Sequence, residues 1–377
     1  MRSSLLPSLL DKTYQPMLKP LLFKFDPEDV HETITTTGEW LGKSQVIQLF
    51  LKRNFRISDP CLLQKYDGIM FENPIGLSAG FDYEAKLPQI TPSLGFGFQT
   101  VGTITYSSCP GNPKPRLGRL PKSQSLLVNK GFKNLGVIAT AKKMQGKNFA
   151  IPIGVSIGRT NDPHLGQKES IKDILKAFAE FQEFQVQNAY FELNISCPNL
   201  FGNVNFYAKQ NLHDLLCEID RLKLHKPLYI KMPIILSNSE ILNMLDVIAR
   251  HKVQGVIIGN LQKDRSDPSL ISEEVAKFPT GNFSGKPTFS RSNELIALTY
   301  KHFKGILLII GCGGVFTAED AYTKITLGAS LVQLITGLVF NGPQLIYTIN
   351  KGLIKILKQN NLQNISHAVG MRNKVTI

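Results

Sequence analysis

Eight short apolar segments recur from about residue 75 onward, and they constrain the fold more than any other feature. They are rich in Ile, Val, Leu and Phe and cover residues 75–79, 96–105, 151–157, 190–196, 228–233, 253–260, 306–314 and 330–336. Continuous apolar runs of this length are typical of strands that are buried on both faces, as in a parallel sheet.

Helical patterns lie between several of these segments. Residues 169–187 place apolar side chains on one stripe, residues 238–251 do the same, and residues 317–327 open with the capping-box spacing of Thr317 and Asp320. Eight strands alternating with helices predict a (β/α)8 TIM barrel. An open doubly wound sheet is the alternative, but it needs fewer strands, and no strand here is followed by a GxGxxG fingerprint.

The first 65 residues differ in kind from residues 66–377, which hold the predicted barrel. Asp26 and Pro27 have the N-cap and first-turn positions of a helix that runs to Gly42, and a second apolar helix covers Val46–Leu51. Two amphipathic helices ahead of a barrel form either a docking or membrane-surface element or a plain cover for the barrel bottom. The pattern alone leaves both interpretations open.

Charge and cysteine content exclude several classes of protein. The chain has 43 basic and 29 acidic residues, a net charge of +14. The positive charges are spread along the sequence, so we expect no nucleic-acid partner. No apolar run reaches the roughly 18 residues of a spanning helix. The five cysteines contain no CxxC pair, so we expect neither a metal site nor a disulfide framework. Their scattered, odd number indicates a protein of the reducing cytoplasm.

In a barrel of this kind the active site lies at the carboxyl ends of the strands. Those positions are rich in Gly, Asn and Thr, contain one Lys and no His, and are poor in carboxylates: Ala79-Gly80, Gly102-Thr103, Ser156, Asn194–Asn199, Lys231, Asn260, Gly313-Gly314 and Thr336-Gly337. This composition argues against paired-carboxylate hydrolysis and against a His-centred triad or metal site.

The last two strands end in glycine-rich turns, IIGCGG at 309–314 and QLITG at 333–337. Such turns let backbone N–H groups approach a phosphate, and the loops after strands 7 and 8 are the usual phosphate site of the fold. We therefore predict phosphate binding there. The alternative is that the glycines only permit tight turns.

Two side chains at strand ends have reactive groups. Cys197, within NISCPN at 194–199, is a candidate general base or nucleophile, and Lys231 is a cation that would stabilise developing negative charge. On the pattern alone, an inert buried thiol and a lysine reaching solvent stay open as alternatives.

Together these motifs resemble the dihydroorotate dehydrogenases, flavin enzymes of pyrimidine synthesis. The resemblance covers nearly the whole chain, and it is carried by KPLLFKFDPEDVHE (19–32), NPIGLSAGFD (73–82), GFGFQTVGTIT (95–105), GNPKPRLGRLP (111–121), NISCPN, FSGKP (283–287), IIGCGG and GASLVQLITG (328–337). The opening segment is similar to the membrane-associated, quinone-using class, whose N-terminal helices form a quinone tunnel.

The resemblance implies FMN in the barrel mouth, with contacts at Ala79, Gly80, Tyr83, Thr103, Ser156, Asn194, Lys231, Gly259, Gly285, Gly313, Gly314, Ile335, Thr336 and Gly337. It also implies substrate contacts at Asn129, Gly131, Phe132, Asn194, Asn199 and Asn260. Cys197 falls where the family keeps its base, so the resemblance makes Cys197 and Lys231 the expected catalytic residues. In the implied reaction the base takes a proton from C5 of dihydroorotate while a hydride passes from C6 to the flavin.

Five positions depart from the family pattern. Cys197 stands where the quinone class usually has Ser, and Tyr83 stands where the family has a Lys that touches flavin and substrate. Val128 and Ser156 replace Asn, and Leu261 replaces Thr.

We therefore expect an FMN-dependent dihydroorotate dehydrogenase that passes electrons to a quinone. We expect it to lie on the cytoplasmic side of the cell membrane, attached peripherally through the N-terminal helices and acidic lipid. Two alternatives remain: the same barrel with fumarate or NAD as acceptor or another cyclic substrate, and a flavin-binding membrane-surface protein without this activity.

Overall fold

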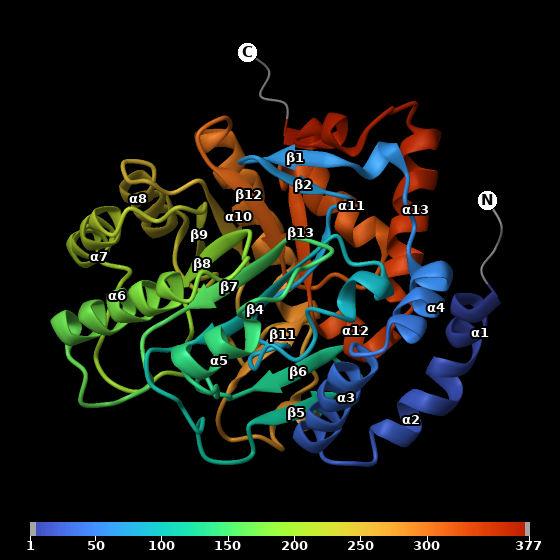
Figure 1. Cartoon of the computed structure of the whole chain (residues 1–377), viewed down its shortest axis with the longest axis horizontal. Coiled ribbons are helices and arrows are strands. Elements are labelled where there is room, and N and C mark those ends of the chain that lie inside the picture. Colours follow the sequence, from blue (N-terminus) through green and yellow to red (C-terminus); the bar gives the residue numbers. More distant parts are fainter. Residues whose placement is uncertain (1–4, 374–377) are drawn as a thin grey trace.

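A closed barrel of eight parallel strands forms the centre of the molecule (Figure 1). The structure is a computed structural model that describes residues 5–373. The strands are neighbours in the order β10-β12-β13-β3-β4-β7-β8-β9. In chain order they are β3 (Ile75–Leu77), β4 (Phe98–Ile104), β7 (Ile153–Ile157), β8 (Tyr190–Asn194), β9 (Leu228–Met232), β10 (Gly255–Ile258), β12 (Leu308–Cys312) and β13 (Leu331–Leu334). Each lies within one of the eight predicted segments, which confirms the barrel.

The outer layer consists of helices that alternate with these strands: α5 (Val137–Met144), α6 (Gln167–Glu183), α7 (Lys209–Arg221), α8 (Asn238–Ile248), α10 (Phe289–Phe303), α11 (Ala318–Leu327) and α13 (Leu345–Gln359). Three further helices are short: α2 (Lys19–Leu22), α9 (Ser272–Val275) and α12 (Thr336–Asn341). The capping box of Thr317 and Asp320 is present on α11, and Ser237 with Glu240 forms another on α8. These caps satisfy backbone N–H groups that have no partner within the helix.

The amino-terminal end of the barrel is closed by a two-stranded hairpin, β1 (Gln64–Tyr66) and β2 (Ile69–Phe71). The hairpin inserts Phe71 against buried side chains of the barrel, including Phe98, Tyr190 and Tyr229. Large buried side chains therefore fill this end of the barrel interior.

Helices from the start of the chain gather on one flank of the barrel (Figure 1): α1 (Leu5–Thr13), a π-helical turn at Tyr14–Leu18, α2, α3 (Pro27–Leu41) and α4 (Gln45–Phe55). The Asp26 carboxylate caps α3, as predicted, by accepting hydrogen bonds from the N–H groups of Glu28 and Asp29. The second helix extends beyond the predicted Val46–Leu51 to Phe55, which is buried. No helix among residues 5–373 is both long and apolar enough to cross a membrane.

A three-stranded antiparallel sheet stands beside the mouth of the barrel and was not predicted. It pairs β5 (Leu117–Leu120) with β6 (Ser125–Val128), and β6 with β11 (Asn282–Gly285). It brings the loop after β6 and the FSGKP motif, which are far apart in the sequence, to the same edge of the barrel mouth.

Candidate functional site

The carboxyl ends of the barrel strands open into a cavity of about 680 Å³ that extends under the N-terminal helices. Among the described residues that line it, the charged side chains are cationic: Arg119, Lys130, Lys133 and Lys231. No Asp or Glu of the described chain lines it. A cavity with this charge favours anionic ligands.

Most of the predicted site residues line this one cavity: Ala79, Gly80, Tyr83, Thr103, Gly131, Phe132, Asn194, Cys197, Asn199, Lys231, Gly259, Asn260, Gly285, Gly313, Gly314, Ile335, Thr336 and Gly337. Two do not. Ser156 lies behind the wall, with its hydroxyl 2.9 Å from that of Thr103. Asn129 is turned into the adjacent loop, where its side-chain oxygen accepts a hydrogen bond from Asn112 at 2.9 Å.

Glycine backbone forms the part of the wall that was predicted to bind phosphate. Gly285, Gly313 and Gly314 have φ angles of +86°, +101° and +68°, a region in which other residues are strained. A Cβ atom on Gly313 would lie 2.5 Å from the Thr288 hydroxyl, so no other residue fits there without movement. Glycine is therefore needed at these positions for the positive φ angles and for close packing against Thr288, Phe289 and Thr336, and the three residues present main chain without side chains in the cavity wall. These glycines and the cations fit a group that carries a phosphate.

Asparagine and hydroxyl side chains form a hydrogen-bonded series across the mouth of the barrel. The Asn194 amide donates to the Thr103 hydroxyl at 2.8 Å, and its oxygen accepts from Ser196 at 3.3 Å. The Asn260 amide in turn donates to the Ser196 carbonyl at 2.9 Å. The amides at the ends of β8 and β10 are thus held in fixed orientations, which suits recognition of a polar planar ligand.

Cys197 and Lys231 supply the reactive groups of the cavity. Burial raises the pKa of Cys197 to about 11, although the backbone hydrogen bond at Asn199 and the charge of Lys231 act in the opposite direction. Lys231 is 6 % exposed, at the end of β9, and donates to the Ser78 hydroxyl at 3.3 Å. The site therefore holds a thiol and a buried cation on the same wall.

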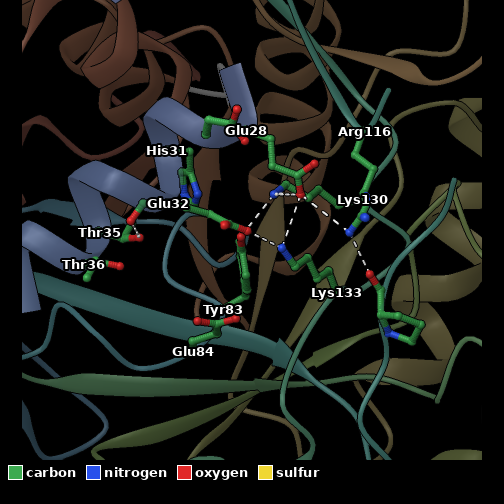
Figure 2. A network of polar contacts seen from close by, with 12 residues as sticks. Glu28, His31, Glu32, Thr35, Thr36, Tyr83, Glu84, Arg116, Lys130 and Lys133 are labelled. Carbon is green, nitrogen blue, oxygen red and sulfur yellow. Dashed lines mark hydrogen bonds and ion pairs between the residues drawn. The ribbon is translucent and has the colours of Figure 1, made fainter. Parts of the chain in front are cut away.

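A network that the sequence did not reveal joins the N-terminal helices to this wall (Figure 2). The Glu28 carboxylate, 5 % exposed on α3, lies 3.0 Å from Lys130 Nζ, 3.5 Å from Lys133 Nζ and 3.6 Å from an Arg116 nitrogen. Lys130 also donates to the Tyr83 hydroxyl at 3.1 Å. Lys133 makes a further ion pair with Glu32.

The charge state of this network follows from its geometry. Burial alone would raise the pKa of Glu28, but the nearby charge of Lys130 and its hydrogen bond, with Arg116 and Lys133, hold the pKa below its usual value. Glu28 is therefore ionised at neutral pH. Lys130, Lys133 and Tyr83 line the cavity, so the network holds part of its wall in place, although Glu28 itself does not line it. The sequence signal that was overlooked is the run of cations, Lys130 and Lys133, around the predicted substrate residues.

The part of the cavity beneath the N-terminal helices is largely apolar. Its wall includes Leu6, Leu10, Leu18, Leu22, Val30, Ile34, Leu41, Leu51 and Phe55. Polar groups here are few: the Tyr14 hydroxyl donates to the Val339 carbonyl at 2.8 Å, and Arg119 lies over the ring of Phe23. Burial, with the charge of Lys130, lowers the pKa of His31 to about 4, so this imidazole is neutral. The cavity thus combines a polar end in the barrel with an apolar end that suits a hydrophobic molecule.

Fold and site together define a barrel enzyme with one cavity for a polar anionic group and a hydrophobic molecule. The comparisons with known proteins specify the family. A family model described as Dihydroorotate dehydrogenase matches residues 61–357. The curated relative from Acaryochloris marina, named Dihydroorotate dehydrogenase (quinone), is 36% identical over 376 residues, with 95% of this chain and 99% of the relative covered. A relative of the same name from Christiangramia forsetii is 36% identical over 346 residues, covering 91% and 99%.

Solved structures agree with this result. DHODH from Eimeria tenella, in complex with ferulenol, superposes with a TM-score of 0.79 at 26% identity, covering 93% of this chain and 96% of that one. The chain belongs to the dihydroorotate dehydrogenase family, and within it to the quinone type. The family predicted from the motifs is therefore confirmed.

Proposed function

We propose that the polar end of the cavity holds FMN beside dihydroorotate, and that the apolar end admits the quinone that accepts the electrons. Membership of the family makes the protein a flavin-dependent oxidoreductase of pyrimidine biosynthesis that oxidises dihydroorotate. The assignment of FMN rests on the glycine backbone at Gly285, Gly313 and Gly314, which suits a single phosphate close to the main chain.

Within the polar end we assign roles to the residues that face the cavity. Asn194, Asn199 and Asn260 bind the polar edges of the substrate, and Gly131 and Phe132 form the loop that covers it. The Cys197 thiolate takes the proton from the substrate carbon, and Lys231 holds positive charge where negative charge develops. The bound flavin supplies the acceptor for the hydride.

Lys130 is a further candidate for substrate binding. It lines the cavity next to Tyr83, the position where the family pattern has a lysine, and its ammonium group lies within hydrogen-bonding distance of the Tyr83 hydroxyl. We propose that this ammonium group provides, from the neighbouring loop, the positive charge that Tyr83 lacks.

The helical segment, residues 1–65, is proposed to be the quinone-binding and membrane-binding element ahead of the catalytic barrel, residues 66–377. Ten of the eighteen exposed large apolar side chains of the described residues lie between Leu9 and Phe50. Lys12, Lys24, Lys43, Lys52 and Arg53 are interspersed with them. Apolar side chains with nearby basic groups suit peripheral attachment to anionic lipid, in keeping with a site on the cytoplasmic face of the cell membrane.

The observation that carries this proposal is a single cavity lined both by the strand ends and by the N-terminal helices. The test has two steps. Dihydroorotate is added without oxygen to the purified yellow protein, and loss of the oxidised-flavin absorbance is followed. Quinone, fumarate or NAD is then added to the bleached protein. We expect rapid bleaching and reoxidation by quinone alone. A protein that stays yellow would contradict the assigned substrate, and reoxidation by fumarate or NAD would contradict the role of the apolar end.

Deletion of residues 1–60 tests the helical segment. The truncated protein should still bleach with dihydroorotate but should reduce a hydrophobic quinone poorly. Equal rates of quinone reduction by the truncated and full-length proteins would refute the proposed role of the helices.

A further inference from the structure

A cluster of potential metal ligands lies on the outer layer of the barrel, in the helical wall rather than in the cavity. His213 and Cys217 are four residues apart on α7, and His251 follows α8 just before β10. One ligand atom from each of the three side chains lies within 4.8 Å of those of the others. Sequence spacing did not reveal this cluster because the third member comes 34 residues after the second.

Two of the three separations between ligand atoms are close to those around a tetrahedral zinc ion, and the third is within 4.8 Å. His213 Nδ1 lies 3.0 Å from His251 Nε2 and 3.8 Å from Cys217 Sγ. Zinc–nitrogen and zinc–sulfur bonds at tetrahedral angles separate two nitrogens by about 3.3 Å, and a nitrogen from a sulfur by about 3.6 Å. His213 is exposed, so a small side-chain rotation would close the difference.

A neighbouring carboxylate orients one of the ligands. His251 Nδ1 lies 2.8 Å from Asp220 Oδ2, and the other oxygen of Asp220 accepts a hydrogen bond from the Lys252 N–H at 3.0 Å. The His251 side chain is only 5 % exposed. Its Nδ1 is thus engaged by the carboxylate, and its Nε2 is left for the cluster, 3.0 Å from His213 Nδ1. Metal-binding histidines commonly have this arrangement, because the carboxylate fixes the ring and makes the free nitrogen a better donor.

We propose that His213, Cys217 and His251 bind a divalent transition-metal ion, with zinc as the best match, and that Asp220 positions His251. Two imidazoles and a thiolate are ligands that zinc prefers, and three protein ligands leave a fourth position for water. The ion would connect α7 to the turn that leads into β10, the strand that ends beside Asn260.

The alternative is that the three side chains form only a hydrogen-bonded network between α7 and the turn after α8. The two interpretations differ in measurable ways. A network needs no ion and is not altered by chelators, whereas a metal site gives saturable binding that depends on the thiolate.

Cobalt(II) is the spectroscopic probe for the test, because tetrahedral cobalt absorbs in the red, where oxidised flavin does not. The untagged, full-length flavoprotein is stripped with a chelator and titrated with Co²⁺, and then with Zn²⁺. We expect one equivalent of Co²⁺ to produce the red bands and Zn²⁺ to abolish them. A protein that shows no red bands, or that binds ions without saturation, would overturn the proposal.

Single substitutions locate the site. Cys217→Ser should change the red bands and weaken binding at least tenfold, and His213→Ala should abolish the rise in melting temperature that Zn²⁺ gives to the parent protein. Asp220→Asn should keep the spectrum but weaken binding by about 10- to 100-fold, as expected for a residue that acts through His251.

Cys61→Ser and His225→Ala are the matched controls, since both residues lie outside the cluster. They should bind Co²⁺ like the parent protein. Flavin content and circular dichroism establish that each variant is folded. Red bands that persist unchanged in Cys217→Ser would exclude these ligands.

Discussion

Cys197, the proposed general base, combines two properties that oppose each other, because a base must first lose its proton, whereas burial favours the protonated thiol. Its pKa of about 11 means that only a small fraction is thiolate at neutral pH. The nearby charge of Lys231 lowers the cost of forming the thiolate without removing it. The rate of the proposed proton transfer should therefore depend steeply on pH, because the amides of the site do not titrate and the Cys197 thiol does.

Replacement of Cys197 by Ala should slow flavin reduction by dihydroorotate about 10²- to 10⁴-fold, the usual contribution of a general base. The flavin should remain bound, because the glycine wall is unchanged. Anaerobic stopped-flow absorbance gives the rate, and the flavin-to-protein absorbance ratio gives the occupancy. A variant that bleaches as fast as the parent would show that another group takes the proton.

The pH dependence of the same step gives a second test. Because the thiolate is the active form and the pKa is raised, the rate should increase with pH from about 7 to about 10, approaching tenfold per unit. In Cys197→Ser this increase should be absent, since a serine hydroxyl does not titrate in the range. A flat profile in the parent protein would argue against Cys197 as the base.

At the level of elements, Glu28 attaches helix α3 to the loop that carries Lys130 and Lys133. Its side chain is nearly inaccessible, and one of its oxygens has no hydrogen-bond partner, so the attachment depends on charge as well as on directed bonds. Removal of one member of a buried ion pair generally costs more than the pair itself contributes, because the remaining charges stay desolvated.

Glu28→Gln should therefore destabilise the attachment of α3 by about 3 kcal/mol, equivalent to about 100-fold faster amide hydrogen exchange in this helix. Glu32→Gln is the control: Glu32 is half-exposed and should cost less than about 1 kcal/mol. Exchange that is equal in the two variants would show that α3 is held by apolar packing alone.

Acid should act on the same attachment. The folded-state pKa of Glu28 lies below its ordinary value of 4.5, so its stabilising contribution is complete above pH 4.5 and is lost as the pH falls through the lowered pKa. Hydrogen exchange in α3 should accelerate in this acidic range in the parent protein and much less in Glu28→Gln.

Elements also differ in how far the sequence predicted them. The barrel strands were predictable because strands buried on both faces are apolar throughout. Two helix starts were predictable because the side chains of Asp26 and Thr317 themselves cap the helices. The side sheet was not predictable, because its strands are four residues long and β6 pairs with a strand more than 150 residues later. Its formation depends on tertiary contacts, which leave no local periodicity.

The lining of the cavity was also predicted only in part. Most of the predicted strand-end residues line the cavity, because the fold determines which end of the barrel is open. Lys130 was missed because its position depends on the loop that follows β6, where Gly131 and Phe132 both adopt positive φ angles. That backbone turns the lysine toward α3 and the cavity, and no spacing rule describes it.

At the scale of the whole molecule, the apolar and basic side chains of the N-terminal helices gather on one flank, away from the proposed metal site on α7 (Figure 1). Trp40, the single tryptophan of the chain, is 66 % exposed on α3. Its fluorescence therefore reports on this flank alone.

We expect the emission of Trp40 to shift to the blue when the protein binds vesicles that contain anionic lipid. The shift should be smaller at high salt, because each basic residue near the surface contributes only about 1 kcal/mol. Vesicles of neutral lipid are the control. An unchanged spectrum with anionic vesicles would place the membrane contact elsewhere.

The Glu28 network also has a consequence for how the sequence can change over evolution. One carboxylate is shared by Arg116, Lys130 and Lys133, so loss of Glu28 removes the common ion-pair partner of all three cations. Substitutions at these four positions should therefore be coupled: a change of charge at one position should be accompanied by a compensating change of charge at another. Among relatives of this chain, positions 28, 116, 130 and 133 should vary together, with the total charge of the group conserved more strongly than any single residue.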